Sequence, residues 1–206
     1  INGVDTDTLR VVHLEAAEDV LQLIIDLAMT GEVSAVVIDS FAGLVPAAEL
    51  AGDIGDSHVG LIGRLASQTL RILTKKMPAN KSETIIVFVN QLRANIGAFG
   101  SESKHTVTGG RAVKFYATTR VNVSRYGQIK QGDEIVGHTV KIKTDKSRLH
   151  PQSKTAMFDV VYGVGILNEA TVLDRCVAAG IVKKSGSWYS VAETGEAIGQ
   201  GRLGSA

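Results

Sequence analysis

Two short runs of apolar residues dominate the hydrophobic pattern of the chain, and each ends on polar side chains. The first run, 35–38, leads into Asp39-Ser40, and the second, 84–89, leads into Asn90-Gln91. Continuous apolar runs of this length, rich in β-branched residues, are typical of strands buried on both faces of a parallel sheet. In open α/β sheets, ligands bind outside the carboxyl ends of such strands. The pattern therefore predicts two neighbouring strands whose polar ends belong to one binding site.

Helical periodicity fills the segments around these runs. Residues 16–30 place apolar side chains on one face, and Gly31 is a natural stop. A second helix is expected from a cap at Ser57 to about residue 77, where Pro78 breaks it. A third is expected at 110–118, and Asn168 is a candidate cap for a last helix at 169–178.

The pattern changes to period-two alternation in the second half of the chain. Alternating segments at 120–124, 138–143 and 157–162 predict an antiparallel meander on a sheet edge. A further short strand is expected at 10–14. The fold class is therefore α/β, a mostly parallel sheet with an antiparallel extension. We expect a core domain over 1–166, followed at 167–206 by the start of a small C-terminal domain that is too short to own a core.

Composition narrows the class of protein. The 206 residues include 22 glycines, which suit the tight strand–helix joints of α/β proteins, and one cysteine, Cys176, which excludes an internal disulfide framework. These features predict a cytoplasmic protein. No apolar run reaches the ~18 residues that span a bilayer, so no membrane role is expected. The chain does not begin with Met and starts within the pattern, so we expect a fragment or a processed piece.

The net charge of +1 conceals a division along the sequence. Residues 1–60 hold eleven acidic residues and one base, Arg10, whereas the remainder holds 21 bases and 10 acidic residues. Polarised charge of this kind attracts a polyanion to one face, although a merely solvated surface is the plainer alternative. His58, His105 and His150 have no metal-ligand spacing with Cys176, which we expect in the core, so no metal site made only of protein ligands is expected.

The strand ends carry the candidate chemistry. A carboxylate such as Asp39 at the carboxyl end of a buried strand can hold magnesium or its water beside a phosphate, as a Walker B residue does. Gln91 ends the neighbouring strand, where a neutral amide can bond a terminal phosphate oxygen. For each of these residues alone, an ordinary strand-end role is the simpler interpretation.

A loop at 93–108 follows the second strand and combines cations, glycines and two large apolar residues, Ile96 and Phe99. Cations can bind phosphates, and apolar side chains can act as wedges or stacking faces for bases. Gly109-Gly110 then allows close backbone approach at the start of a helix. The alternative is a flexible surface loop. Two exposed large apolar residues are weak evidence against it.

Taken together and in this order, these segments resemble the bacterial RecA recombinases. The resemblance is carried by VVIDSFAGLVPAAELAGDIGDSHVGLIGRLASQTLR, FVNQLRANIGAFG, TGGRAVKFYATTRVNVSR, VVYGVGI, GSWYS and GEAIGQG, and it covers essentially all 206 residues. RecA proteins also carry a phosphate loop, a catalytic Glu and an adenine-stacking Tyr before this region. None of these is in the chain, and GxxxxGK[ST] occurs nowhere in it.

The resemblance implies ATP and Mg²⁺ as cofactors. Asp39 and Ser40 look like the Walker B pair, with Asp39 holding magnesium through water, and Gln91 looks like the sensor of the γ-phosphate. Tyr162 and Gly163 match positions beside the adenine. The family has two lysines, separated by one residue, that reach the ATP of the neighbouring subunit. Lys146 matches the second of them, and the first is either a displaced Lys143 or Thr144.

The resemblance also implies two DNA-binding loops. The first is 49–60, with Ile54 and Val59, and the second is 93–108, with Arg93, the inserting residue Ile96 and Phe99. Contacts to the DNA backbone are implied for Arg64, Ser67, Arg71, Thr108, Gly109, Gly110 and Arg111. Phe115 matches a residue of the interface between subunits.

The function expected from the resemblance is an ATP-dependent filament on single-stranded DNA that pairs it with homologous double-stranded DNA and exchanges strands, in recombination and repair. ATPase activity of this chain by itself is left open, because the phosphate loop and the catalytic Glu are absent. The alternative is a DNA-binding or assembly module complemented by a separate chain that carries the phosphate loop.

Overall fold

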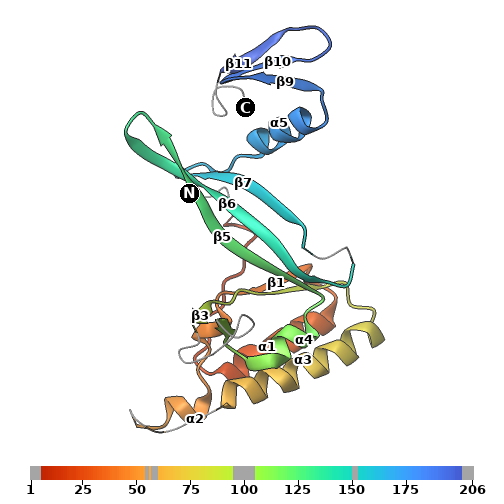
Figure 1. Cartoon of the computed structure of the whole chain (residues 1–206). Coiled ribbons are helices and arrows are strands. Elements are labelled where there is room, and N and C mark those ends of the chain that lie inside the picture. Colours follow the sequence, from red (N-terminus) through yellow and green to blue (C-terminus); the bar gives the residue numbers. More distant parts are fainter. Residues whose placement is uncertain (1–5, 54–55, 57–59, 95–104, 150–152, 201–206) are drawn as a thin grey trace. The chain divides into compact units, whose positions relative to one another are not determined.

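The structure is a computed structural model that describes residues 6–53, 56, 60–94, 105–149 and 153–200. The chain divides into two compact units. Val11–Ala117 form the N-proximal unit, and Thr118–Ala206 together with Ile1–Arg10 form the C-proximal unit. Figure 1 shows the elements of both units.

The N-proximal unit is built on a parallel pair of strands. β1 (Ala35–Ile38) pairs with β2 (Ile85–Phe88) in a register that sets Ile38 opposite Phe88. The remaining elements are α1 (Ala17–Thr30), the 3₁₀ turn η1 (Phe41–Gly43), α2 (Ala47–Leu50), α3 (Leu61–Ala79), β3 (Leu92–Ala94), β4 (His105–Val107) and α4 (Gly110–Tyr116). β3 and β4 pair antiparallel, so the segment expected as a loop at 93–108 has strands at both ends.

Helices α1 and α3 cover one face of the β1–β2 pair and form the core of this unit with it. The ring of Phe41 packs edge-on against Phe88, with centroids 5.5 Å apart, and Phe41 is one of the most deeply buried side chains. The other buried members of this core are Leu21, Ile24, Ile25, Ala28, Ile38, Ala66 and Leu73. On the opposite face, Val37 and Ile85 are 62% and 63% exposed. The prediction of strands buried on both faces is therefore correct for one face only in the part of the chain that is described.

The helix boundaries confirm some sequence signals and correct others. α1 ends as predicted before Gly31, whose φ of 75° suits a left-handed cap. α3 begins at Leu61 behind Gly60, and it continues through Pro78, where the sequence pattern predicted a break. The Asn80 N–H donates to the Lys76 carbonyl oxygen at 2.9 Å, which closes the last turn around the proline.

The short strand expected at 10–14 is wrong. These residues carry no strand, and Val11 and Val12 are exposed. A strand is stabilised by its ladder to a neighbour, and none of the described strands pairs with this segment. Two adjacent valines therefore predicted a structure that they do not adopt here.

The C-proximal unit contains an antiparallel sheet in the order β5 (Thr119–Gln131), β6 (Glu134–Ser147), β7 (Thr155–Val161), β8 (Gly165–Ile166). The predicted antiparallel meander is confirmed, but among the described strands it forms a sheet of its own and not the edge of the β1–β2 pair. Its strands are longer than expected, and β5 and β6 pair through three register shifts. Asp159 is buried and accepts a hydrogen bond of 2.7 Å from the Thr139 hydroxyl.

A smaller cluster closes the described chain. It consists of α5 (Asn168–Ala178) and a three-stranded sheet of β9 (Val182–Ser185), β10 (Trp188–Val191) and β11 (Ala197–Gln200), with Leu173, Val182 and Tyr189 at its centre. Asn168 is the first residue of α5 rather than its cap, because the N-cap position is Leu167, which makes no side-chain capping bond.

Across the described residues, no helix combines the length and the apolar character that a membrane span requires.

Gly137 tests the β6–β7 pairing. A Cβ at Gly137 would collide with the backbone carbonyl of Val160, so Gly137→Ala should destabilise the unit by about 1–3 kcal/mol, the usual range for overpacking. The measurement is urea unfolding followed by circular dichroism. Gly127→Ala on β5 is the matched control, because a Cβ there meets nothing within 4 Å. Equal midpoints for both variants would contradict the described β6–β7 register.

Candidate nucleotide and nucleic-acid interface

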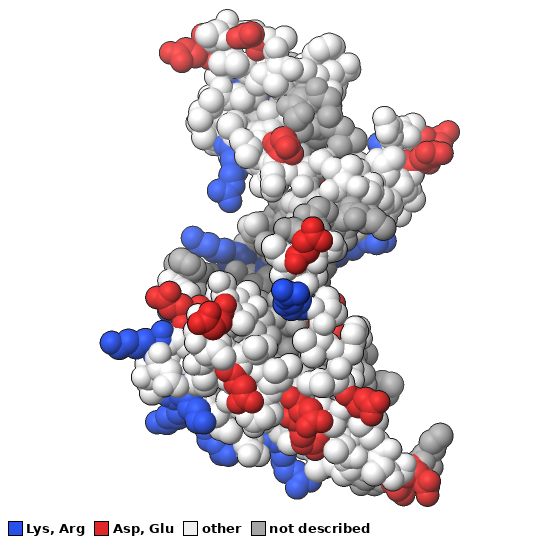
Figure 2. Space-filling view, turned by 180° about the vertical axis from the view of Figure 1, so that it is seen from behind, with Lys and Arg blue, Asp and Glu red and all other residues white. Residues whose placement is uncertain are grey.

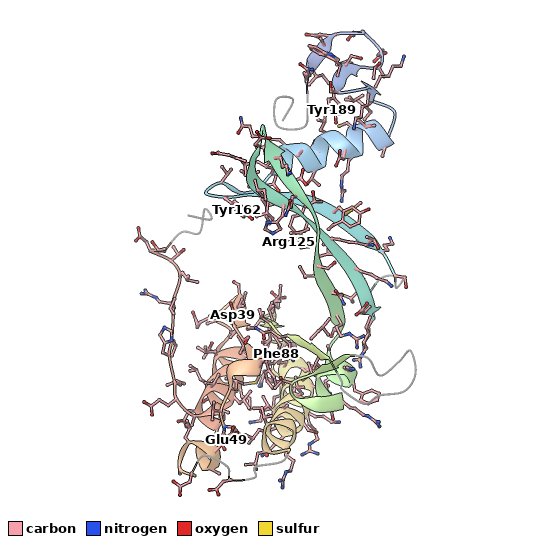
Figure 3. The ribbon with its side chains drawn as sticks, turned by 60° about the vertical axis from the view of Figure 1, so that its left-hand side comes forward. Asp39, Glu49, Phe88, Arg125, Tyr162 and Tyr189 are labelled. Carbon is pink, nitrogen blue, oxygen red and sulfur yellow. The ribbon has the colours of Figure 1, made fainter. Side chains whose placement is uncertain are left out.

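The carboxyl ends of β1 and β2 lie side by side, because the backbone pairing continues beyond both strands. The Val89 N–H donates to the Ile38 carbonyl at 3.0 Å, and the Phe41 N–H donates to the Val89 carbonyl at 2.8 Å. Asp39-Ser40, joined by a cis peptide bond, therefore lie next to Asn90-Gln91. Asp39 and Gln91 are exposed and Ser40 is half-buried. Figure 3 shows Asp39 near Phe88 at these strand ends.

This edge brings together two of the predicted nucleotide contacts, a carboxylate and an amide. Magnesium in phosphate sites is usually held by one or two carboxylates together with phosphate oxygens and water. One exposed carboxylate beside a hydroxyl fits that donor set. An exposed amide on the neighbouring strand can donate to an oxygen of the same ligand.

The first candidate DNA loop begins from a fixed point. The Ala47 N–H, at the start of α2, donates to Glu18 Oε2 of α1 at 2.9 Å, and the Ala17 N–H donates to the Val45 carbonyl at 2.8 Å. Pro46 between them is fully buried. Two of the residues predicted to contact DNA in this loop, Ile54 and Val59, lie outside the described residues.

The second candidate loop is anchored where it rejoins the core. The Asn90 side chain donates through Nδ2 to the Thr108 carbonyl at 2.9 Å, and Gly109 packs directly on the ring of Phe41. Only the backbone of Arg93 is described, within β3. Ile96 and Phe99 lie outside the described residues.

Helices α3 and α4 carry the predicted contacts to the DNA backbone. Arg64 and Arg71 are exposed and seven residues apart, which places them on one face of α3 nearly two turns from each other. Ser67 lies between them in the sequence and is half-buried, and Arg111 on α4 is exposed. Figure 2 shows Lys and Arg gathered along one margin of the helical part of the surface, while Asp and Glu spread over its middle. Phe115, the predicted interface residue, is 67% exposed.

The remaining predicted nucleotide contacts belong to the C-proximal unit. Tyr162 and Gly163 follow β7, and the Tyr162 N–H donates to the Val136 carbonyl at 2.9 Å. Tyr162 is 55% exposed, and its ring lies 5.9 Å from the ring of His138, measured between centroids. Gly163 has a φ of 79°, which a turn after the strand requires.

The two candidate lysines lie on β6. Lys143 is exposed, and Lys146 is half-buried opposite Arg120, which forms an ion pair of 3.6 Å with Asp145. Burial lowers the pKa of Lys146, and the nearby cations Arg148 and Arg120 lower it further. The folded chain therefore favours the neutral amine more than the unfolded chain does, and the resulting destabilisation disappears as the pH rises above this lowered pKa.

Sequence reasoning missed Glu18 and Phe41 and assigned no role to Asn90 beyond ending a strand. Glu18 lies 29 residues before Ala47, and Asn90 lies 18 residues before Thr108. Bonds between a side chain and a distant backbone group leave no periodic pattern. The one available signal was the pair of consecutive amides at the end of an apolar run.

The helices with their parallel and antiparallel sheets, taken unit by unit, fit an α/β protein with a RecA-type core. The model of the RecA N-terminal domain matches residues 1–167, and that of the RecA C-terminal domain matches residues 170–205. The chain therefore belongs to the RecA family, as the resemblance predicted.

Curated relatives support the same conclusion. Protein RecA of Chlorobium limicola is 46% identical over 200 residues, which are 97% of this chain and 56% of that protein. Protein RecA of Pseudarthrobacter chlorophenolicus is 46% identical over 199 residues, and that of Caldanaerobacter subterraneus is 47% identical over 201. The chain thus spans little more than half the length of the curated relatives it matches.

Gly109 tests the packing at the end of the second loop. A Cβ at this position would lie 2.6 Å from Phe41 Cε1 and 2.9 Å from Val113 Cγ2, on a backbone with a φ of 86°. Gly109→Ala should therefore lower the unfolding free energy by about 2–4 kcal/mol, from clash and strain together. Gly110→Ala is the control, because its φ is also positive but its Cβ would meet nothing within 4 Å, so it should cost about 1 kcal/mol. Thermal and urea unfolding measure both, and a Gly109 variant as stable as the Gly110 variant would rule out the Phe41 contact.

Proposed function

We propose that this chain acts in homologous recombination and DNA repair, as the part of a RecA recombinase that binds single-stranded DNA and supplies one side of an ATP site. The observation that carries the proposal is the shared strand edge. Asp39, Gln91 and the anchored residue Thr108 are all connected to the ends of β1 and β2. In such an arrangement, a ligand that contacts the strand ends lies near the base of a loop that can contact DNA.

At the nucleotide, each residue has a distinct role. Asp39 and Ser40 would hold Mg²⁺, in part through water, and Gln91 would donate its amide to an oxygen of the γ-phosphate. Bound Mg²⁺ would neutralise charge on the phosphate oxygens. Tyr162 and Gly163 would lie beside the adenine, and Lys143 and Lys146 would reach the nucleotide of a neighbouring copy.

On DNA, the two loops would hold the strand and separate groups of bases for Watson–Crick testing against a duplex. Backbone phosphates would be bound by Arg64, Ser67, Arg71 and the segment Thr108–Arg111, and such contacts fix position without reading sequence. Phe115 would contact a neighbouring copy in a helical filament. ATP bound between copies would favour the DNA-bound state, and hydrolysis would release the DNA.

A second candidate function is that of a DNA-binding or assembly module without an ATPase of its own, complemented by a separate chain that carries the phosphate loop. The open face of the β1–β2 pair favours it. Val37, Ile85 and Val87 are exposed there, although apolar runs of this kind are usual in strands covered on both faces. Co-purification of the chain with a polypeptide that carries GxxxxGK[ST] would support this alternative.

The arginines of α3 test DNA binding. Arg64→Ala and Arg71→Ala should each weaken the binding of an oligothymidylate and of a mixed-sequence oligonucleotide to the same degree. Each should also make the salt dependence of single-strand binding shallower, by up to ~0.7 for every phosphate that the arginine no longer neutralises. The measurement is fluorescence anisotropy at several salt concentrations.

Lys76→Ala is the control for these two variants. At 100° per residue, Lys76 lies about 140° around α3 from Arg71, so its loss removes a charge from another side of the helix. Slopes that do not differ among the three variants would remove the arginine face from the DNA contacts.

The chain as given should not hydrolyse ATP alone. Phosphoryl transfer needs backbone N–H groups and a lysine around the β- and γ-phosphates, and a base for the attacking group, whereas Asp39 and Gln91 offer only a magnesium ligand and a sensor. Phosphate release is measured with and without single-stranded DNA, and Asp39→Ala serves as the control. DNA-stimulated turnover that Asp39→Ala abolishes would show that another segment of this chain binds the phosphates.

A further inference from the structure

We infer that Asn90 is a positioning residue for DNA binding, which ties the end of β2 to the segment Thr108–Arg111 and so sets where this segment meets a nucleic-acid phosphate. The inference rests on the proposed function, because it assumes that Thr108–Arg111 contact single-stranded DNA. It adds a residue that the proposed function does not itself use.

Both ends of the Asn90 amide are used in backbone contacts. Oδ1 accepts a hydrogen bond of 2.9 Å from the N–H of Gln91, and Nδ2 donates to the carbonyl oxygen of Thr108 at 2.9 Å. With one end of the amide bound to each segment, the side chain cannot rotate without losing a bond on both sides. Asn90 is half-buried, so water replaces these bonds less readily than at an exposed site.

A second contact involves Gly109, whose N–H belongs to the same peptide. A Cβ at Gly109 would lie only 2.6 Å from Phe41 Cε1, so the backbone of Gly109 rests on the Phe41 ring. Phe41 is 1% exposed, and its own N–H donates to the Val89 carbonyl. The Asn90 amide and the Phe41 ring therefore both contact the Thr108–Gly109 segment, and both residues are connected to the end of β2.

The chemical consequence concerns the residues that follow. Because a peptide unit is planar, fixing the Thr108 carbonyl also fixes the orientation of the Gly109 N–H. Gly109 and Gly110 both have positive φ, and without an external tie two glycines give the chain unusual conformational freedom. The Asn90 bond restricts that freedom just before Arg111, whose exposed guanidinium is a candidate phosphate contact.

Asparagine suits this position through its two unlike ends. An aspartate has the same shape and can still accept from the Gln91 N–H, but it cannot donate to the Thr108 carbonyl and places a second oxygen against it. Asn90→Asp therefore breaks the tie to Thr108 and leaves the bond to Gln91. Asn90→Ala removes both bonds without adding charge.

The experiment uses the 206-residue chain with two measurements. Hydrogen exchange of the amides at 114–117, the first that hydrogen bonds within α4 can protect, should accelerate about tenfold in both Asn90 variants because the start of the helix loosens. The amides of Phe41 and Val89, which report the β1–β2 pairing, should stay within about twofold of wild type. The affinity for an oligothymidylate should fall about three- to tenfold, as expected for one broken hydrogen bond at the contact. Asn80→Asp is the charge control, since it makes the same substitution at the end of α3 and should change neither measurement.

The outcomes separate this inference from the proposed function. If wild type binds the oligonucleotide and both Asn90 variants bind it as tightly with unchanged exchange at 114–117, the positioning role is wrong and DNA binding stands. Exchange that rises equally at Phe41 and Val89 would also overturn the inference, because Asn90 would then only stabilise the fold. If the wild-type chain fails to bind the oligonucleotide at low salt, the proposed function is wrong. The exchange data would still decide whether Asn90 restricts the conformation of Thr108–Arg111.

Discussion

The parallel pairing of β1 with β2 is the constraint on which the candidate site depends. Its register sets Ile38 opposite Phe88, so that both strands end at the same level and their polar extensions become neighbours. Side chains alternate between the faces of a strand, and a slip by one residue would exchange the faces. If β1 slipped in this way, Ile38 would leave the helices and Val37 would enter the core in its place. The core packing of α1 and α3 thus fixes the position of Asp39 relative to Gln91.

Sequence patterns predicted the elements that build this edge. The apolar runs at 35–38 and 84–89, the amphipathic helix before Gly31 and the alternating segments from residue 120 onward all correspond to elements of the structure. Each of these signals is local and periodic. Burying one face of a helix or strand requires the same spacing of apolar residues that the sequence shows. Polar residues directly after the two strands were enough to predict that Asp39 and Gln91, two of the candidate nucleotide contacts, lie at one edge.

The features that the sequence could not predict depend on contacts between distant segments. The two valines at 11 and 12 predicted a strand. A strand needs a neighbouring strand to pair with, and the periodicity of the sequence does not show whether one is present. Pro78 predicted the end of α3, but the last turn of the helix includes it, because the Asn80 N–H donates to the Lys76 carbonyl. The hydrogen bonds from Ala47 to Glu18 and from Asn90 to Thr108 join a side chain to a backbone group. Any residue type could have stood at position 108, and any except proline at position 47, so the sequence gives no signal of these bonds.

The open face of the β1–β2 pair connects the stability of the core with the geometry of the site. A pair of strands gains most of its stability from the layers packed against it, and here the described residues supply such a layer on the side of α1 and α3. Along each strand the exposed apolar residues, Val37 on β1 and Ile85 and Val87 on β2, alternate with residues that face the helices. Any layer that covered Val37 and Val87 would therefore press on the same backbone that carries Asp39 and Gln91. Covering this face and setting the spacing of the two nucleotide contacts are, for this reason, physically coupled.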